Sequence, residues 1–288
     1  MIISVLNISF ILTINDKWSA LEILHVLGYI GAFVVGLVLG IIGSGGSILS
    51  MPILVYLFKL NAVTASAYSL FIVGVTALTG SFQNFKKKLI NYRTTILFSI
   101  SAVISVYVTR KYLIGLIPEV ILSNNFITIK KDQMIMIVFG ILMLVAGYFM
   151  IKRTPKTIIK FKKTKTIAPN KLLIFFEGSI VGFLTGLVGA GGGFIIIPIL
   201  VILSDLKMKS AVATSLLIVS AKSLIGFIGD IQNLIIEWNF LIRFSAISVF
   251  GIATGQIIRK KIKENHLKKI FGSLVLIIGL LVLLKEII

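Results

Sequence analysis

Long apolar runs, separated by short polar stretches, make up most of the chain. No Asp, Glu, Lys or Arg occurs from Ile23 to Phe58, from Leu60 to Phe85, from Gln133 to Ile151 or from Gly178 to Ser204. A helix needs about 20 mostly apolar residues to cross a bilayer, and several of these runs reach that length. The pattern predicts an all-α, multi-pass membrane protein embedded in a lipid bilayer.

Ten apolar segments divide into two sets of five. The first set runs roughly over 23–42, 47–58, 62–82, 94–117 and 134–151, and the second over 172–188, 194–204, 210–228, 240–258 and 270–284. The second segment of each set is short, since about twelve helical residues cover only about 18 Å of a hydrocarbon core of about 30 Å. Met1 to Ile14 lacks a basic start and a cleavage site, so we expect an additional partial segment rather than a signal peptide.

The two sets of segments align with each other. Gly36 to Phe82 matches Gly182 to Ile228 without a gap, and 19 of the 47 aligned pairs are identical. The matches include glycine and proline positions, which fix backbone geometry. The sequence therefore predicts a first transmembrane repeat over 1–151, a basic linker over 152–171 and a second transmembrane repeat over 172–288. A polar stretch from Ser123 to Asp132 is the expected insertion in the first repeat.

Two membrane topologies fit these segments. If the short second segments are re-entrant, each repeat has four crossings and the repeats are parallel. If they count as crossings, each repeat has five and the repeats are inverted. The number of full crossings is therefore between eight and ten.

Charge favours the inverted topology. Cytoplasmic loops collect Lys and Arg, and the linker over 152–171 contains eight of them and no acid. With this linker in the cytoplasm, inverted repeats place the basic stretches 86–93 and 259–269 there as well. The loop over 229–239 then lies outside, with Asp230 and Glu237 interpreted as loop charges and with a guard at an entrance as the alternative for Asp230. Arg110 and its basic neighbours would also lie outside, against the rule.

Composition excludes several classes of function. The chain is 57% hydrophobic and 14% charged, with a formal net charge of +19, whereas soluble proteins have about 25% charged residues. The basic residues lie between apolar runs, so they indicate membrane topology and not nucleic-acid binding. The chain has no cysteine and only two histidines, so we expect no metal site and no cofactor. No nucleophile has a plausible base beside it, which argues against an enzyme.

Glycine-rich motifs lie between the first and second segments of each repeat. Such glycine density should break a membrane helix, and the freed backbone groups cannot face lipid. The start of the following short helix would then direct N–H donors at an internal cavity, which suits an anion. The alternative is close helix packing, which Gly36 and Gly40 and their counterparts Gly182 and Gly186 are expected to provide. The predicted binding residues of the motifs are Gly43, Ser44, Gly45, Gly46, Ser47, Gly189, Ala190, Gly191, Gly192 and Gly193, with Pro52 and Pro198 as structural helix breakers.

The third segment of each repeat adds polar side chains to this candidate site. Ser69 aligns with Ser215 and Thr76 aligns with Lys222, and each pair on one segment is two helical turns apart. Lys222 lies inside an apolar run, and an ionisable residue there is a functional hypothesis by default. The alternatives are that Lys222 extends to the membrane surface and that the hydroxyls bond their own helix backbone.

The motifs resemble those of the TauE/SafE family of sulfite exporters. The resemblance rests on the run from Gly36 to Ser47 with Pro52, on the run from Gly186 to Gly193 with Pro198, and on the stretch that begins at Lys222. It implies a multi-pass permease of the bacterial inner membrane for sulfite, sulfoacetate or related anions.

The sequence thus predicts a secondary transporter for a small sulfur-containing anion, such as sulfite or an organosulfonate. The glycine motifs, Ser69, Thr76, Ser215 and Lys222 would hold the substrate. Two alternatives are a small-anion channel and a membrane assembly protein without transport. The coupling ion, the direction of transport and the oligomeric state are left open.

Overall fold

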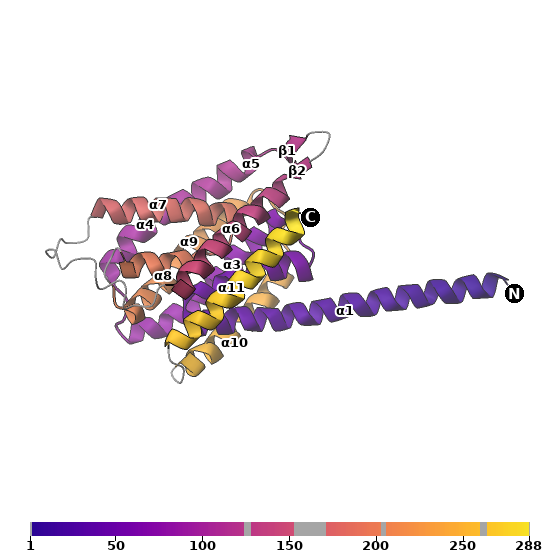
Figure 1. Ribbon diagram of the computed structural model, residues 1–288, viewed down its shortest axis with the longest axis horizontal. Coiled ribbons are helices and arrows are strands. Elements are labelled where there is room, and N and C mark those ends of the chain that lie inside the picture. Colours follow the sequence, from indigo (N-terminus) through magenta and orange to yellow (C-terminus); the bar gives the residue numbers. More distant parts are fainter. Residues whose placement is uncertain (1, 124–127, 153–170, 203–205, 260–263, 288) are drawn as a thin grey trace.

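The computed structural model describes residues 2–123, 128–152, 171–202, 206–259 and 264–287. Within these residues the chain is almost entirely helical, and the helices form one bundle (Figure 1). The helices of the first half are α1 (Ile2–Ile42), α2 (Ser50–Pro52), α3 (Ala62–Lys86), α4 (Tyr92–Val108), α5 (Ile114–Leu116) and α6 (Lys131–Lys152). Those of the second half are α7 (Lys171–Val188), α8 (Gly193–Ile202), α9 (Met208–Ile231), α10 (Trp238–Arg259) and α11 (Glu264–Ile287).

The predicted all-α membrane architecture is confirmed. Six helices in the described part of the chain are long and apolar enough to cross a membrane, and two shorter apolar helices span Gly46–Leu57 and Leu172–Val188. Because a lipid-facing helix satisfies all its backbone groups internally, long apolar helices are the expected solution for such a sequence. The linker is predicted over 152–171, and residues 153–170 lie outside the described residues.

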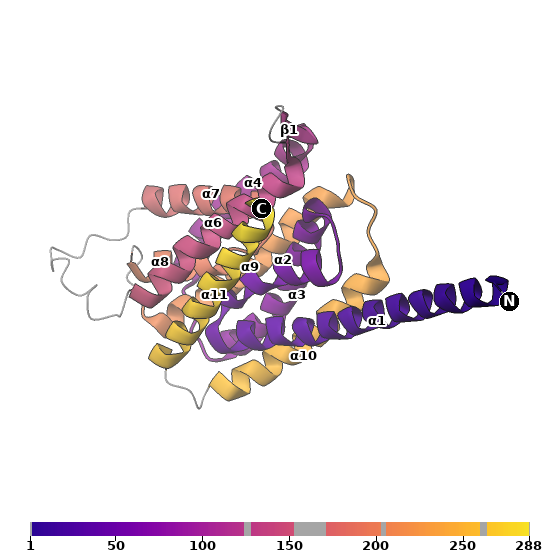
Figure 2. The ribbon, with the colours of Figure 1, turned by 45° about the vertical axis from the view of Figure 1, so that its right-hand side comes forward.

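The start of the chain differs from the prediction. Ile2 to Ile42 form one continuous helix, so Met1 to Ile14 is not a separate partial segment. The N-terminal part of α1 projects far beyond the bundle (Figures 1 and 2). The polar residues between the two apolar stretches do not end a helix, because no proline or glycine occurs from Ile2 to Leu27.

Both glycine motifs break a helix, as predicted. After α1, Gly43 has φ 90° and the chain continues as a 3₁₀ helix η1 (Ser44–Leu49), α2 and a π-helix η2 (Ile53–Leu57). After α7, three glycines at positions 189, 191 and 192 have φ between 64° and 72°, a conformation that other residues rarely adopt. The prediction for Pro198 was wrong, since α8 continues through it to Ile202. The glycines end α7, and Pro52 marks only the change from α-helix to π-helix.

Helices from the two halves pack in pairs, so the halves do not form separate bodies. α3 packs against α9, α6 against α11, α1 against α10 and α4 against α7. α3 and α9 run antiparallel, because the ring centroids of Phe71 and Phe227 lie 4.9 Å apart and a Cβ on Gly74 would contact Leu224. α6 and α11 also run antiparallel, because Cβ atoms on Gly140 and Gly147 would contact Leu283 and Leu276 respectively.

Small residues bring paired helices into backbone contact, as predicted for the glycines spaced four apart. A Cβ on Gly36 would overlap the carbonyl oxygen of Ser248 in α10, and a Cβ on Gly182 would lie 2.5 Å from that of Ala102 in α4. Gly36 aligns with Gly182, and Ser248 aligns with Ala102 at the same offset. Positions that align between the halves therefore make matching contacts.

The two strands of the described chain lie at the predicted insertion 123–132, with β2 inside it and β1 mostly before it. β1 (Val120–Ser123) and β2 (Thr128–Lys130) pair antiparallel, with Val120 opposite Lys130 and Ser123 opposite Thr128. The two strands lie at the edge of the bundle, next to the start of α6 (Figure 2).

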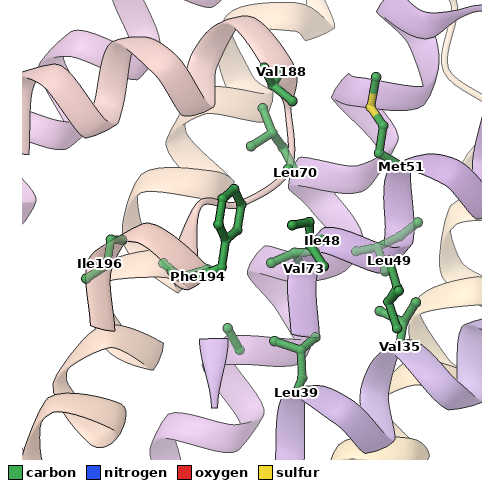
Figure 3. Packing of buried hydrophobic residues seen from close by; sticks show 14 of the residues in the cluster. Val35, Leu39, Ile48, Leu49, Met51, Leu70, Val73, Val188, Phe194 and Ile196 are labelled. Carbon is green, nitrogen blue, oxygen red and sulfur yellow. The ribbon is translucent and has the colours of Figure 1, made fainter. Parts of the chain in front are cut away.

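Apolar side chains from both halves surround the two helix breaks. Figure 3 shows Phe194 of α8 near Ile48 of η1 and near Leu70 and Val73 of α3, with Ile196 farther away on α8. All five side chains are buried. The breaks are therefore held inside a packed core, and their backbone groups do not face lipid.

Candidate functional site

The two helix breaks meet inside the bundle. Ser44 Oγ donates to the carbonyl oxygen of Gly193 (3.3 Å), and a Cβ on Gly193 would overlap the backbone of Ser44. A Cβ on Gly191 would lie 2.6 Å from Cγ1 of Val73 and 3.1 Å from Cβ of Ser47. Only glycine fits this approach, because any side chain at position 193 would displace the opposite backbone.

Hydroxyl groups follow the first break in a connected series. Ser44 Oγ donates to Ser215 Oγ (2.6 Å), and Ser47 Oγ donates to the carbonyl of Ser44 (2.9 Å). Ser50 Oγ lies 2.7 Å from the carbonyl of Ser47 and 2.5 Å from Ser69 Oγ. All five serines are fully buried. The predicted Ser44, Ser47, Ser69 and Ser215 therefore lie together in the structure. Ser50, which was not predicted from the sequence, connects Ser47 to Ser69.

Lys222 lies at the second break. Its side chain is 0% exposed, and Nζ donates to Thr185 Oγ1 (2.6 Å) in α7. A Cβ on Gly192 would lie 3.3 Å from this nitrogen. Lys222 therefore does not extend to the membrane surface, and in the described part of the chain no carboxylate lies within 4.0 Å of it. Thr185 was missed by the sequence reasoning, although it lies one helical turn before Gly189.

Thr76 does not join this group by a hydrogen bond to another helix. Its Oγ1 donates to the carbonyl of Ile72 (2.6 Å) in its own helix. It is fully buried, and it lies next to the crossing of α3 and α9, where Gly74 meets Leu224. The structure therefore confirms the alternative given for the Thr76 hydroxyl, which is a hydrogen bond to the backbone of its own helix.

The remaining motif positions line the breaks. A Cβ on Gly43 would contact Val212, one on Gly46 would overlap the backbone of Leu39, and one on Gly189 would overlap Ser66. Gly45 lies in η1. The carbonyl of Ala190 accepts from the N–H of Gly192 (2.7 Å), which tightens the second break. Each break is therefore positioned by the third helix of the opposite half.

A buried ion pair lies at one end of this region. Arg110, in the π-helix η3 (Thr109–Leu113), is 1% exposed, and its Nη2 lies 2.6 Å from Asp230 Oδ2. Asp230 is 2% exposed and belongs to α9. The interpretation of Asp230 as a loop charge was therefore wrong, because Asp230 is buried in α9 and paired with Arg110. Sequence alone does not reveal the pair, because 120 residues separate its members.

Comparison with known proteins agrees with the fold and the motifs. The sequence profile named sulfite exporter TauE/SafE matches residues 29–282. The chain belongs to this family. No solved structure matches the chain significantly.

Several relatives cover nearly the whole chain. Probable membrane transporter protein MJ0441 of Methanocaldococcus jannaschii is 27% identical over 287 residues, which cover 95% of this chain and 100% of that protein. Probable membrane transporter protein YunE of Bacillus subtilis is 26% identical, with 88% and 96% covered. A Probable membrane transporter protein of Xylella fastidiosa (strain Temecula1) is 24% identical, with 88% and 92% covered. Membership of this family and the membrane-spanning helices make the protein a multi-pass membrane transporter.

Proposed function

We propose that the protein is a secondary transporter for a small sulfur-containing oxyanion, such as sulfite or an organosulfonate. One observation carries the proposal: Lys222 is fully buried, has no nearby carboxylate in the described chain, and reaches the second helix break. A buried cation without a paired anion is costly. An anionic substrate bound there would remove that cost.

The groups around Lys222 suit an oxyanion. Ser44, Ser69 and Ser215 supply hydroxyls; Ser44 now donates to Ser215 and Ser215 to the carbonyl of Val212, so these two would turn to donate to a bound substrate. α8 begins at Gly193, and because the N–H groups of Ile195 and Ile196 donate to the carbonyl of Gly192, the first-turn donors left for a substrate are those of Gly193 and Phe194. The positive end of the α8 dipole therefore adds to the charge of Lys222. Three kinds of donor would converge on a substrate with several acceptor oxygens.

The proposed mechanism is alternating access by two inverted repeats. The antiparallel packing of α3 on α9 and of α6 on α11 supports this arrangement, because inverted repeats are related by a two-fold axis in the membrane plane. The matching contacts of Gly36 and Gly182 support a duplication. The basic linker 152–171 would lie in the cytoplasm. Movement of the paired helices would expose the breaks to one side at a time.

Transport in reconstituted vesicles tests this function. The purified protein is reconstituted, and uptake of sulfite, sulfoacetate, taurine, sulfate and chloride is measured with and without a proton or sodium gradient. The expected result is saturable uptake of a sulfur oxyanion or organosulfonate that depends on a gradient. Uptake without saturation or coupling would favour a channel. No uptake of any anion by correctly folded protein would contradict the proposal.

A further inference from the structure

Arg110 connects four elements at one end of the bundle. Its Nε donates to Asp230 Oδ2 (2.6 Å) at the end of α9, and Nη1 donates to Ser66 Oγ (2.8 Å) at the start of α3. Nη1 also donates to the carbonyl of Gly186 (3.2 Å) near the end of α7. Arg110 itself follows α4 in η3. The side chains of Arg110, Asp230 and Ser66 are not among the proposed substrate-binding residues.

The contacts of Arg110 extend to the second helix break. Ser66, which accepts from Arg110, is the residue that a Cβ on Gly189 would overlap. Gly186 lies one residue from Thr185, the partner of Lys222. Along α3, Ser66 is three residues before Ser69. Arg110 therefore lies between the break and one end of the bundle, and it joins η3 to α9 by the ion pair and to α3 and α7 by hydrogen bonds.

The aligned positions of the other half close the opposite end with neutral groups. Arg110 aligns with Gln256, Asp230 with Asn84 and Gly186 with Gly40. Gln256 Nε2 in α10 donates to the carbonyl of Gly80 in α3 (2.8 Å), and Asn84 Nδ2 donates to the same oxygen within its own helix α3 (3.2 Å), so the contact between helices is that of Gln256. A Cβ on Gly40 would lie 2.8 Å from the backbone nitrogen of Gln256. The same place in the fold thus holds an ion pair at one end and two amides at the other.

We propose that Arg110 and Asp230 form a gate that closes one end of the transport path, and that Gln256 and Asn84 form a weaker gate at the other. Hydrogen bonds between charged groups are roughly twice as strong as those between neutral groups. The Arg110 gate therefore opens less readily than the Gln256 gate. In the orientation given by the basic linker, Arg110 lies at the outer end, so the resting transporter opens preferentially to the cytoplasm. This inference rests on the proposed alternating access.

Accessibility of single cysteines tests the gate, because the chain has no native cysteine. Ser69→Cys reports access from the Arg110 end, and Ser215→Cys reports access from the other end. The gate is weakened by the double substitution Arg110→Gln with Asp230→Asn, which copies the neutral gate. Lys111→Gln is the matched control, because it removes the neighbouring charge of the same π-helix without touching the pair. A membrane-impermeant maleimide is added to intact cells or to inside-out vesicles.

The double substitution should raise labelling of Ser69→Cys from outside by roughly tenfold or more. It should slow labelling of Ser215→Cys from the cytoplasmic side, because outward-open states gain population. The Lys111→Gln control should change neither rate. Unchanged Ser69→Cys labelling in the folded double variant, or an equal rise in the control, would overturn the gate.

A milder variant covers the case in which the double variant does not fold. Ser66→Ala removes one hydrogen bond of Arg110 and leaves the ion pair. It should raise labelling of Ser69→Cys from outside by about two- to fivefold, and a folded Ser66→Ala protein without any rise would also overturn the gate. Protection of both cysteines by ethanesulfonate tests the binding site separately. Loss of protection with a normal gate response would count against the proposed substrate and not against the gate.

Discussion

Replacement of Lys222 by Met should remove most of the affinity for an anionic substrate. Met has a similar length and no charge, so the buried volume changes little. Nζ of Lys222 lies 2.6 Å from Thr185 Oγ1, so an anion that takes the place of this acceptor would be in direct contact with the charge. Two unit charges 4 Å apart attract by about 4 kcal/mol at an effective dielectric constant of 20.

That attraction sets the expected size of the effect. Because 1.4 kcal/mol changes an equilibrium constant about tenfold, loss of the full attraction would weaken binding by up to roughly 1,000-fold. Desolvation of the anion offsets part of the attraction. We therefore expect the apparent affinity to fall by at least about 30-fold in Lys222→Met, and by less in Lys222→Arg, which keeps the charge.

The assay is concentration-dependent uptake in vesicles, with the folded state of each variant checked by size-exclusion chromatography. Lys209→Met is the matched control, since it removes an exposed charge near the start of the same helix. It should transport normally. Lys222→Met protein that is folded and transports with unchanged affinity would refute the assigned role of the charge. The oxyanion would then have to be held by hydroxyl and backbone N–H groups alone.

Three further predictions follow from the topology, the breaks and the serine series. A cysteine at Lys87 should react with an impermeant reagent only from the cytoplasm and one at Asn233 only from outside, whereas labelling from one common side would exclude inverted repeats. Gly193→Ala should abolish uptake, because its Cβ overlaps a backbone, while Gly115→Ala in open space should transport normally; equal uptake of both would contradict the close approach. Ser44→Ala should lower stability by about 1–3 kcal/mol in thermal unfolding in detergent, because it leaves buried polar partners unpaired, and an unchanged midpoint would count against this.

The features that could be predicted from the sequence are those that local rules decide. Apolar length fixes the spanning helices, and glycine clusters such as Gly189 to Gly193 break a helix wherever they occur. A lone Lys222 in an apolar run is conspicuous for the same reason, since its cost in a membrane does not depend on the fold. Pro198 was misjudged because a proline inside a membrane helix need not end it when neighbouring groups satisfy the freed backbone carbonyl, and α8 continues through Pro198.

The features that could not be predicted depend on contacts between distant segments. Arg110 lies next to Lys111 near the end of an apolar run, where a loop or interface position is the common outcome. Its burial follows from Asp230, 120 residues away, and from the approach of α7. Thr185 and Ser50 are ordinary hydroxyls in sequence. They become part of the site only because the two breaks meet.

Only the second half has a lysine, Lys222, at this aligned position, and the packing of α3 on α9 explains why the first half has Thr76 there instead. Thr76 and Lys222 align, and the contact between Gly74 and Leu224 sets the crossing of α3 and α9 beside both. A second lysine at position 76 would place two buried cations on either side of one crossing, with no carboxylate within 4.0 Å of Lys222 in the described chain to offset them. Like charges in a low-dielectric interior repel strongly. The anion site proposed at this crossing can therefore keep one cation, and at the aligned position Thr76 bonds the carbonyl of Ile72 in its own helix.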